Sequence, residues 1–139
     1  MIRKLCLEDM EQVIELWIHG NLDAHSFIPR NYWESHAAEV REQLLCAEVY
    51  VYEENGSILG FAGLQRNYFA GIFVQKESRG NRIGKRLLDH VKFVHPSITL
   101  NVYQKNQRAV SFYKREGFSV LQAGIDPETG EIDYTMGWK

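Results

Sequence analysis

Hydrophobic positions along the chain follow two spacings, and the changes between them divide it into helices and strands. Apolar residues recur every three or four positions in four stretches, which is typical of amphipathic helices, and in short alternating or continuous runs elsewhere, which is typical of strands. The expected helices cover residues 7–20, 32–45, 83–94 and 106–115. The expected strands cover residues 1–5, 48–53, 58–64, 68–74, 98–103, 118–125 and 132–138.

Residues that end or turn the backbone separate these elements. Gly20 and Asn21 are expected to end the first helix, and Gly117 to follow the last one in a left-handed conformation. Asn55-Gly56 predicts a tight hairpin turn, and residues 126–130 predict a longer one. The order β-α-α-β-β-β-α-β-α-β-β predicts an α/β (α+β) fold in which helices pack on a mixed sheet.

Length and composition narrow the class of protein. The 139 residues suit one domain, expected over 1–139, and 45% hydrophobic with 24% charged residues is ordinary for a soluble globular protein. A net charge of -2 argues against nucleic acid as the main partner, and no apolar run is long enough for a membrane helix, so we expect a cytoplasmic protein. Cys6 and Cys46 lack disulfide or metal-ligand spacing and are expected to be buried thiols, and no metal site is expected.

The segment between strand 68–74 and helix 83–94 has the features of an anion site. A loop that enters a helix N-terminus presents backbone N–H groups without intrahelical acceptors, and the basic residues of 79–86 add positive charge. A P-loop is excluded because Gly80 and Gly84 enclose only three residues and no Ser or Thr follows Lys85. A dinucleotide-binding loop is excluded because its third glycine is missing.

Two segments resemble the GNAT acyltransferase family. Residues 79–85, Arg-Gly-Asn-Arg-Ile-Gly-Lys, resemble its acyl-CoA loop, written Gln/Arg-x-x-Gly-x-Gly/Ala. Residues 106–118 match its Asn-x-x-Ala-x-x-Phe-Tyr-x-x-x-Gly-Phe segment at every specified position. The element order also resembles that of the family, which implies a mostly antiparallel sheet. His25-Ser26-Phe27-Ile28 and Tyr32-Trp33 are similar to a subgroup of small bacterial members that includes protein lysine acetyltransferases.

This resemblance implies an enzyme that transfers an acetyl group from acetyl-CoA to a primary amine of a protein lysine, a peptide N-terminus or a small molecule. The end of the third meandering strand would pair with the pantetheine arm as an added strand, the loop would bind the pyrophosphate, and the last helix would line the other side. The implied cofactor residues are Ile72, Phe73, Val74, Arg79, Gly80, Asn81, Arg82, Ile83, Gly84, Lys85, Asn106 and Tyr113. Phe112 belongs either to this lining or to the core.

By the same resemblance, Tyr113 would be the general acid. A phenol of pKa about 10 stays protonated at neutral pH and can donate to a departing thiolate of pKa about 8.5. Some relatives have a catalytic glutamate where this chain has Asn101, whose amide cannot act as a base. We therefore expect water held by polar groups to carry the proton, with a mostly neutral His25 as a possible relay; a loop histidine could equally be solvated.

The acceptor side is expected to contain Asn101 and four residues of the turn and second helix, His25, Phe27, Tyr32 and Trp33. Aromatic groups of this kind can clamp an amine or the stem of a lysine. Phe27 and Trp33 could equally fasten the helix to the sheet. The sequence leaves both alternatives open.

Two departures from the family pattern leave a second function open. Arg82 stands where the family usually has glycine; we expect it to be tolerated, with position 82 in the helical region and its side chain within reach of a phosphate. Together with Asn101, it also suits a coenzyme A binding module with little or no turnover. A monomer and a homodimer are both compatible with the chain, because the last hairpin could form a dimer edge.

Overall fold

The computed structural model describes residues 1–139 as a seven-stranded sheet with four α-helices. The helices are α1 (Met10–Ala24), α2 (Arg30–Cys46), α3 (Ile83–Val94) and α4 (Gln107–Arg115). The strands are β1 (Ile2–Lys4), β2 (Glu48–Glu54), β3 (Ser57–Gln65), β4 (Tyr68–Val74), β5 (Ile98–Tyr103), β6 (Ser119–Ile125) and β7 (Ile132–Trp138). Short 3-10 turns, η1 (Leu7–Asp9) and η2 (Lys76–Ser78), precede α1 and α3. No helix combines the length and the apolar character needed to cross a membrane.

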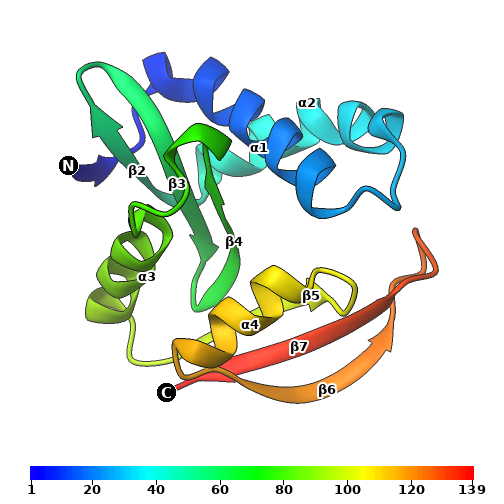
Figure 1. The fold of residues 1–139 in the computed structure, drawn as a ribbon. Helices are drawn as coiled ribbons and strands as arrows, with labels where there is room; N and C mark the ends of the chain where they lie inside the picture. Colours follow the sequence, from blue (N-terminus) through cyan, green and yellow to red (C-terminus); the bar gives the residue numbers. More distant parts are fainter.

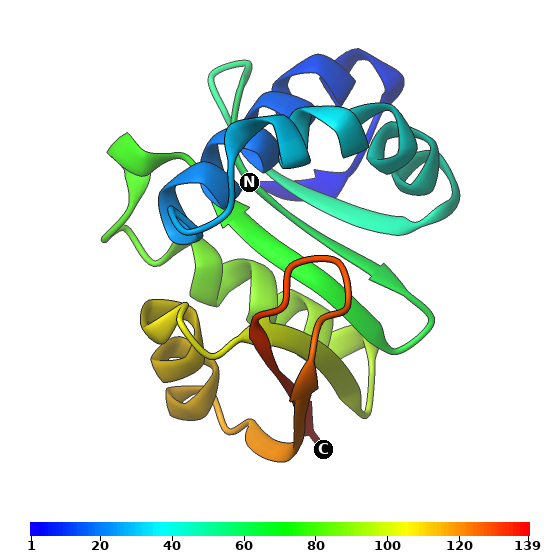
Figure 2. The ribbon, with the colours of Figure 1, turned by 90° about the vertical axis from the view of Figure 1, so that its right-hand side faces the viewer.

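The strands form one mixed sheet in the order β1-β2-β3-β4-β5-β7-β6. Every neighbouring pair is antiparallel except β4 and β5, which are parallel. In Figure 1 the strands up to β4, with α1 and α2, form one arm, and β5 to β7 with α4 form the other. The arms meet beside α3 and diverge on the opposite side, and Figure 2 looks onto that open side. The predicted fold class, a mostly antiparallel mixed sheet flanked by helices, is confirmed.

Alternation along the strands places apolar side chains on both faces of the sheet. On one face, α1 and α2 cover a cluster that includes Val13, Val51 and Phe61. On the other, α3 and α4 cover a larger cluster that includes Leu87 and Phe69. Because both faces are covered, each helix stripe that the sequence predicts has an apolar surface to pack against.

Helix α1 is longer than predicted. The sequence predicts an end at Gly20 and Asn21, whereas the helix continues to Ala24. The glycine serves a close approach instead, because a Cβ on Gly20 would lie 2.8 Å from Cδ1 of Phe73 on β4. Asn21 is buried, and its side-chain amide donates to the carbonyl oxygen of Trp17 at 2.8 Å. The extra turn brings the end of α1 alongside the open edge of β4.

Both cysteines are exposed, which corrects the expectation of buried thiols. Cys6 lies at the start of the surface turn η1, where its sulfur accepts a hydrogen bond from Arg3 at 3.6 Å. Cys46 is the last residue of α2, and the apolar contact at that end comes from the buried Leu44. Each thiol therefore lies at the end of a secondary-structure element, on the surface of the protein.

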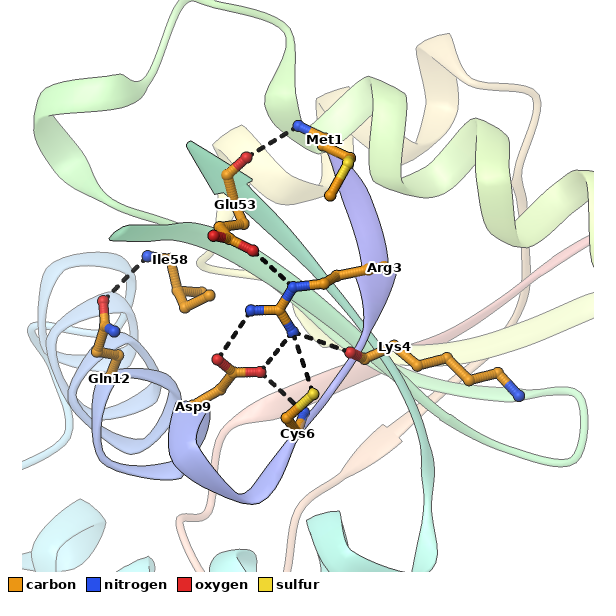
Figure 3. Close-up of polar contacts among 8 residues, drawn as sticks. All are labelled: Met1, Arg3, Lys4, Cys6, Asp9, Gln12, Glu53 and Ile58. Atoms are coloured by element: carbon orange, nitrogen blue, oxygen red, sulfur yellow. Dashed lines mark hydrogen bonds and ion pairs between the residues drawn. The ribbon is translucent and has the colours of Figure 1, made fainter. Parts of the chain in front are cut away.

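A charged cluster around Arg3 joins β1, η1 and β2 (Figure 3). The Arg3 guanidinium donates to both carboxylate oxygens of Asp9, at 2.7 and 3.0 Å, and to Glu53 at 2.6 Å. Asp9 also accepts from the backbone N–H of Cys6 at 2.8 Å. The Asp9 side chain is only 8% exposed, and its bonds to Arg3 lower its pKa. Removal of the guanidinium would leave a buried carboxylate without its cation.

We predict that Arg3→Met lowers the free energy of unfolding by about 2 kcal/mol at neutral pH, because Asp9 loses its cation. The folded-state pKa of Asp9 lies below its unfolded value, so this contribution is present above about pH 4 and is lost as the pH falls further. Urea denaturation of both proteins should therefore give a difference that shrinks on acidification. Arg41→Met, which removes an exposed ion pair with Glu11, is the control and should cost much less than Arg3→Met, because solvent screens exposed charges. Equal losses in the two variants would contradict the argument.

Candidate active site

The centre of the site is the point where β4 and β5 separate. These parallel strands pair only through Tyr68 with Thr99 and Phe69 with Leu100. Beyond that point β4 remains bonded to β3 but has no partner on its other side. Gly71, at a φ of 150°, lies at the bend, a conformation that favours glycine. The N–H and C=O groups on the free side of residues 71–74 are therefore available to an added extended chain.

A cavity of about 540 Å³ lies between the separated strands. Its wall on one side is β4 with the end of α1, and on the other β5, β7 and α4. Ile72, Phe73 and Val74, the predicted partners of the pantetheine arm, line it from β4, and Asn106 and Tyr113 line it from the side of α4. The structure thus brings both halves of the predicted cofactor site to one cavity.

The loop at one end of the cavity contains the predicted anion-binding groups. Helix α3 begins at Ile83, and its first backbone bond runs from the N–H of Arg86 to the carbonyl of Arg82. The N–H groups of residues 83–85 consequently have no acceptor within the helix. Gly80, at a φ of 91°, turns the chain toward this terminus. The helix end therefore offers donors and a positive dipole to an anion.

The members of this loop differ in their surroundings. Arg79 and Gly84 line the cavity, whereas Gly80 and Asn81 are exposed beyond it. Ile83 is buried in the core, so its side chain packs and only its backbone N–H faces the terminus. Lys85 pairs with Glu116 at 3.0 Å and with Asp89 at 3.4 Å, and its pKa is raised mainly by Glu116.

Arg82 has a left-handed backbone, at φ 61° and ψ 22°. The expectation that position 82 lies in the helical region is therefore wrong. The residue caps the N-terminus of α3, where the chain has to turn into the helix, and glycine adopts that conformation without a steric penalty. Arginine is accommodated there at a backbone cost, and its exposed side chain projects from the anion loop.

An ion cluster connects the two arms at the same end of the cavity. Asp23, near the end of α1, pairs with Arg79, and its carboxylate lies 3.7 Å from Arg108 at the start of α4. The pKa of Asp23 is lowered, mainly by its hydrogen bond from Arg79. Arg79, Arg108 and Arg115 all line the cavity, so its wall carries three guanidinium groups.

Helix α4 supplies the groups on the wall facing β4. Its N-cap Asn106 accepts the backbone N–H of Ala109 at 3.3 Å. Phe112 lines the cavity and also packs against the core, so a place in the core does not exclude a place in the cavity lining. Tyr113 is buried, and burial raises the pKa of its phenol. The Tyr113 hydroxyl is thus a neutral donor over the whole neutral pH range.

An aromatic cluster lies where the sequence predicts the acceptor side. His25 is buried rather than solvated, and its ring lies 5.0 Å from that of Tyr103 and 5.7 Å from that of Trp33. Burial lowers the pKa of His25 to about 4, which keeps it neutral. Nδ1 of His25 and Nε1 of Trp33 are buried without a hydrogen-bond partner. Two unpaired polar atoms therefore lie beside the cavity that both residues line.

The other two aromatic residues predicted for this end lie outside the cavity lining. Phe27 packs edge-on against Tyr103 at 5.9 Å, with the ammonium of Lys105 5.2 Å from its ring. Tyr32 donates to Glu128 in the β6–β7 turn at 3.2 Å. The bond from Tyr32 fastens the β6–β7 turn to the start of α2 on the open side of the molecule (Figure 2).

Asp133 on β7 is a cavity residue that the sequence reasoning missed. Its carboxylate lies 3.4 and 3.5 Å from Nδ2 of Asn101, which also lines the cavity. Burial raises the pKa of Asp133. No sequence motif marks this residue; only the pairing of β5 with β7 brings it to the site.

A sheet that opens between two parallel strands, with a free edge and a helix N-terminus at one cavity, has the features expected of a protein that binds an acyl-coenzyme A. The comparisons give the family. A family model described as "Acetyltransferase (GNAT) domain" matches residues 46–120. The chain is 36% identical to the peptidyl-lysine N-acetyltransferase YiaC of Escherichia coli, over 99% of this chain and 96% of that one. The chain belongs to the GNAT family of acetyl-CoA-dependent N-acetyltransferases.

Solved structures agree with this assignment. The solution structure of apo YjaB from Escherichia coli superposes with a TM-score of 0.87 at 26% identity, covering 99% of this chain and 96% of that one. The PaiA N-acetyltransferase of Thermoplasma acidophilum, solved in complex with coenzyme A, superposes with a TM-score of 0.84 at 24% identity, covering 100% and 98%. The second likeness supports the fold.

The backbone at Arg82 gives a prediction about stability. Arg82→Gly should be at least as stable as the wild type, because glycine removes the left-handed penalty, whereas Arg82→Val should lose about 1–2 kcal/mol. Chemical denaturation measures both. A loss of about 1 kcal/mol in the glycine variant, as in a helix interior, would contradict the left-handed assignment. Both variants remove the same side chain, so an equal loss of coenzyme A affinity would show that the guanidinium contacts a phosphate.

Proposed function

We propose that this protein transfers the acetyl group of acetyl-CoA to the ε-amine of a peptidyl lysine by direct attack, as a single domain over residues 1–139. The observation that carries the proposal is the free edge of β4 facing Tyr113 across one cavity. The relative at 36% identity, which is named a peptidyl-lysine N-acetyltransferase, supports this acceptor class. A peptide N-terminus and a small amine are the other acceptors compatible with the site.

The cofactor fits the cavity by its chemistry. Pantetheine carries amide groups that can pair with the free backbone of Ile72, Phe73 and Val74 as an added strand. The pyrophosphate then lies at the terminus of α3 with its free N–H groups, beside Arg79. Asn106 borders the same arm from α4. In this proposed arrangement the thioester would lie in the cavity near Tyr113.

Tyr113 acts as the general acid. When the amine attacks the carbonyl carbon, the C–S bond breaks and a thiolate forms in a site where a charge is poorly solvated. Burial raises the pKa of the phenol, and exclusion of water raises the proton affinity of the thiolate in the same direction. The buried hydroxyl can therefore donate to the sulfur as it leaves.

The acceptor enters from the aromatic end. Trp33 and His25, with the nearby Tyr103, form a wall suited to the methylene stem and ammonium group of a lysine. Phe27 and Tyr32 support this wall and the neighbouring turn from outside.

The test is to incubate the protein with acetyl-CoA and separate pools of lysine peptides with blocked N-termini, peptides with free N-termini and no lysine, and small amines. Thiol release should be fastest with the first pool. Preference for another pool would contradict the lysine assignment but leave acetyl transfer intact. Binding of acetyl-CoA without turnover in any pool would favour the second candidate, a coenzyme A binding module. Two observations support that candidate, the unfavourable backbone conformation of Arg82 and the amide side chain of Asn101.

We predict that Tyr113→Phe lowers kcat by about 100-fold or more while the affinity for acetyl-CoA stays within about threefold. The ring still packs in the core, and only the proton donor is lost. The pKa of Tyr113 is raised, so the loss should be similar across the neutral range. Tyr52→Phe, which removes a hydroxyl that accepts from Arg86 on the far side of α3, is the matched control. Full kcat in the Tyr113 variant would show that it is not the general acid.

A further inference from the structure

The cavity contains one carboxylate, that of Asp133. The residue lies on β7 opposite Tyr103 of β5, and Asn101 pairs with Thr135 one step along the same ladder. Residues two apart on a strand share a face, so Asp133 and Thr135 project beside Asn101 on the cavity side. The register of β5 and β7 therefore brings a potential proton acceptor to the wall where the acceptor amine would arrive.

Asn101 holds this carboxylate in place. The hydroxyl of Tyr68 donates to Oδ1 of Asn101 at 2.8 Å, which turns Nδ2 toward β7. Nδ2 in turn donates to Oγ1 of Thr135 at 3.1 Å and faces both oxygens of Asp133 at 3.4 and 3.5 Å. Because an amide can present its donors only opposite its acceptor, Tyr68 fixes the direction from which Asp133 is bonded. Asn101 is thus a positioning residue.

We propose that the Asp133 carboxylate is the catalytic base that takes a proton from the ammonium group of the acceptor before the amine attacks acetyl-CoA. The inference rests on the proposed function, because it assigns a role in that reaction. It gives Asn101 a role that needs no basicity of its own.

The charges of the cavity favour Asp133 over His25, the other titratable group at the acceptor end. Transfer of a proton from an ammonium to a carboxylate replaces two charges by two neutral groups, which burial favours. Transfer to His25 would move a positive charge into a deeper site, and burial already lowers the pKa of that ring to about 4. The pKa of Asp133 is raised instead, by burial and by the nearby Asp126. This rise makes the carboxylate a stronger base.

The groups around Asp133 are compatible with this role. Asp126, in the β6–β7 turn, accepts a hydrogen bond from Tyr103 at 2.5 Å. Tyr68 has a raised pKa, from burial and from the charge of Asp133, so it remains a neutral donor. The hydrogen bonds from Asn101 and from the backbone of Val102 act against burial and lower the pKa of Asp133 in part.

The proton balance closes with the groups present. The ammonium gives one proton to Asp133, and the neutral amine forms the C–N bond. Collapse of the tetrahedral species breaks the C–S bond, and the leaving sulfur takes a proton from Tyr113. The new amide nitrogen releases its second proton, which restores Tyr113 directly or through water, and Asp133 releases its proton to solvent. The products are the amide, the coenzyme A thiol and one proton.

The test uses the full chain and the acceptor that gives the fastest thiol release. Asp133→Asn should lower kcat by about 100-fold near pH 7 and leave the Kd for acetyl-CoA unchanged. The amine of pKa about 10.4 loses its own proton as the pH rises, so the defect should narrow to under about tenfold near pH 9. Asp133→Glu should recover part of the rate. Glu54→Gln, which changes an exposed carboxylate at the end of β2, is the control and should leave kcat unchanged.

Asn101→Ala supplies a second readout. Loss of its hydrogen bond should raise the pKa of Asp133 and move the acidic limb of the kcat profile to higher pH. A rate defect in Asp133→Asn that is the same at every pH, or no defect at all, would overturn the base assignment, and acetyl-CoA binding would show that the variant is folded. Absence of turnover in the wild type would contradict the proposed acetyl transfer itself, and the proposed role of Asp133 as its base would be contradicted as well.

Discussion

The short pairing between β4 and β5 is the constraint on which the site depends. Two residue pairs join the arms, and beyond them the sheet gives up backbone hydrogen bonds along one edge of β4. An unpaired edge inside a protein is costly unless something completes it. Here α3 holds the arms together at the closed end through its contacts with the core. The open end can therefore keep a free backbone edge for an extended ligand.

The anion end shows a second compromise between stability and binding. Arg82 takes a left-handed conformation so that α3 can begin with its N–H groups directed at the loop. The helix stays in place because Leu87, Leu88 and Val91 are completely buried against the sheet. Apolar packing of this extent outweighs one unfavourable backbone conformation. Asp23 pairs with Arg79, so a phosphate bound at the proposed cofactor site would compete with that carboxylate for the guanidinium.

Local signals predicted what depends on neighbours in sequence. The bounds of β4 and β5 were expected as they are, and Gly117 has the left-handed conformation proposed for it, at φ 96°. Features that depend on contacts between distant segments were missed. The sequence around Gly20 indicates a helix end unless Phe73 is known to lie against it. The position of His25 in a loop indicates a solvated side chain unless Tyr103 and Trp33 are known to enclose it. The register of β5 with β7, which brings Asp133 to the site, has no signature in the sequence.

Burial of one cavity acts on three groups in directions that suit three roles. Exclusion of water disfavours charge, so Tyr113 is kept as a neutral phenol, His25 as a neutral ring and Asp133 as a stronger base than a solvated aspartate. The same dry environment favours the transfer that begins the reaction, since an ammonium and a carboxylate become neutral together. The geometry of the open sheet thus sets the electrostatics as well as the shape of the site.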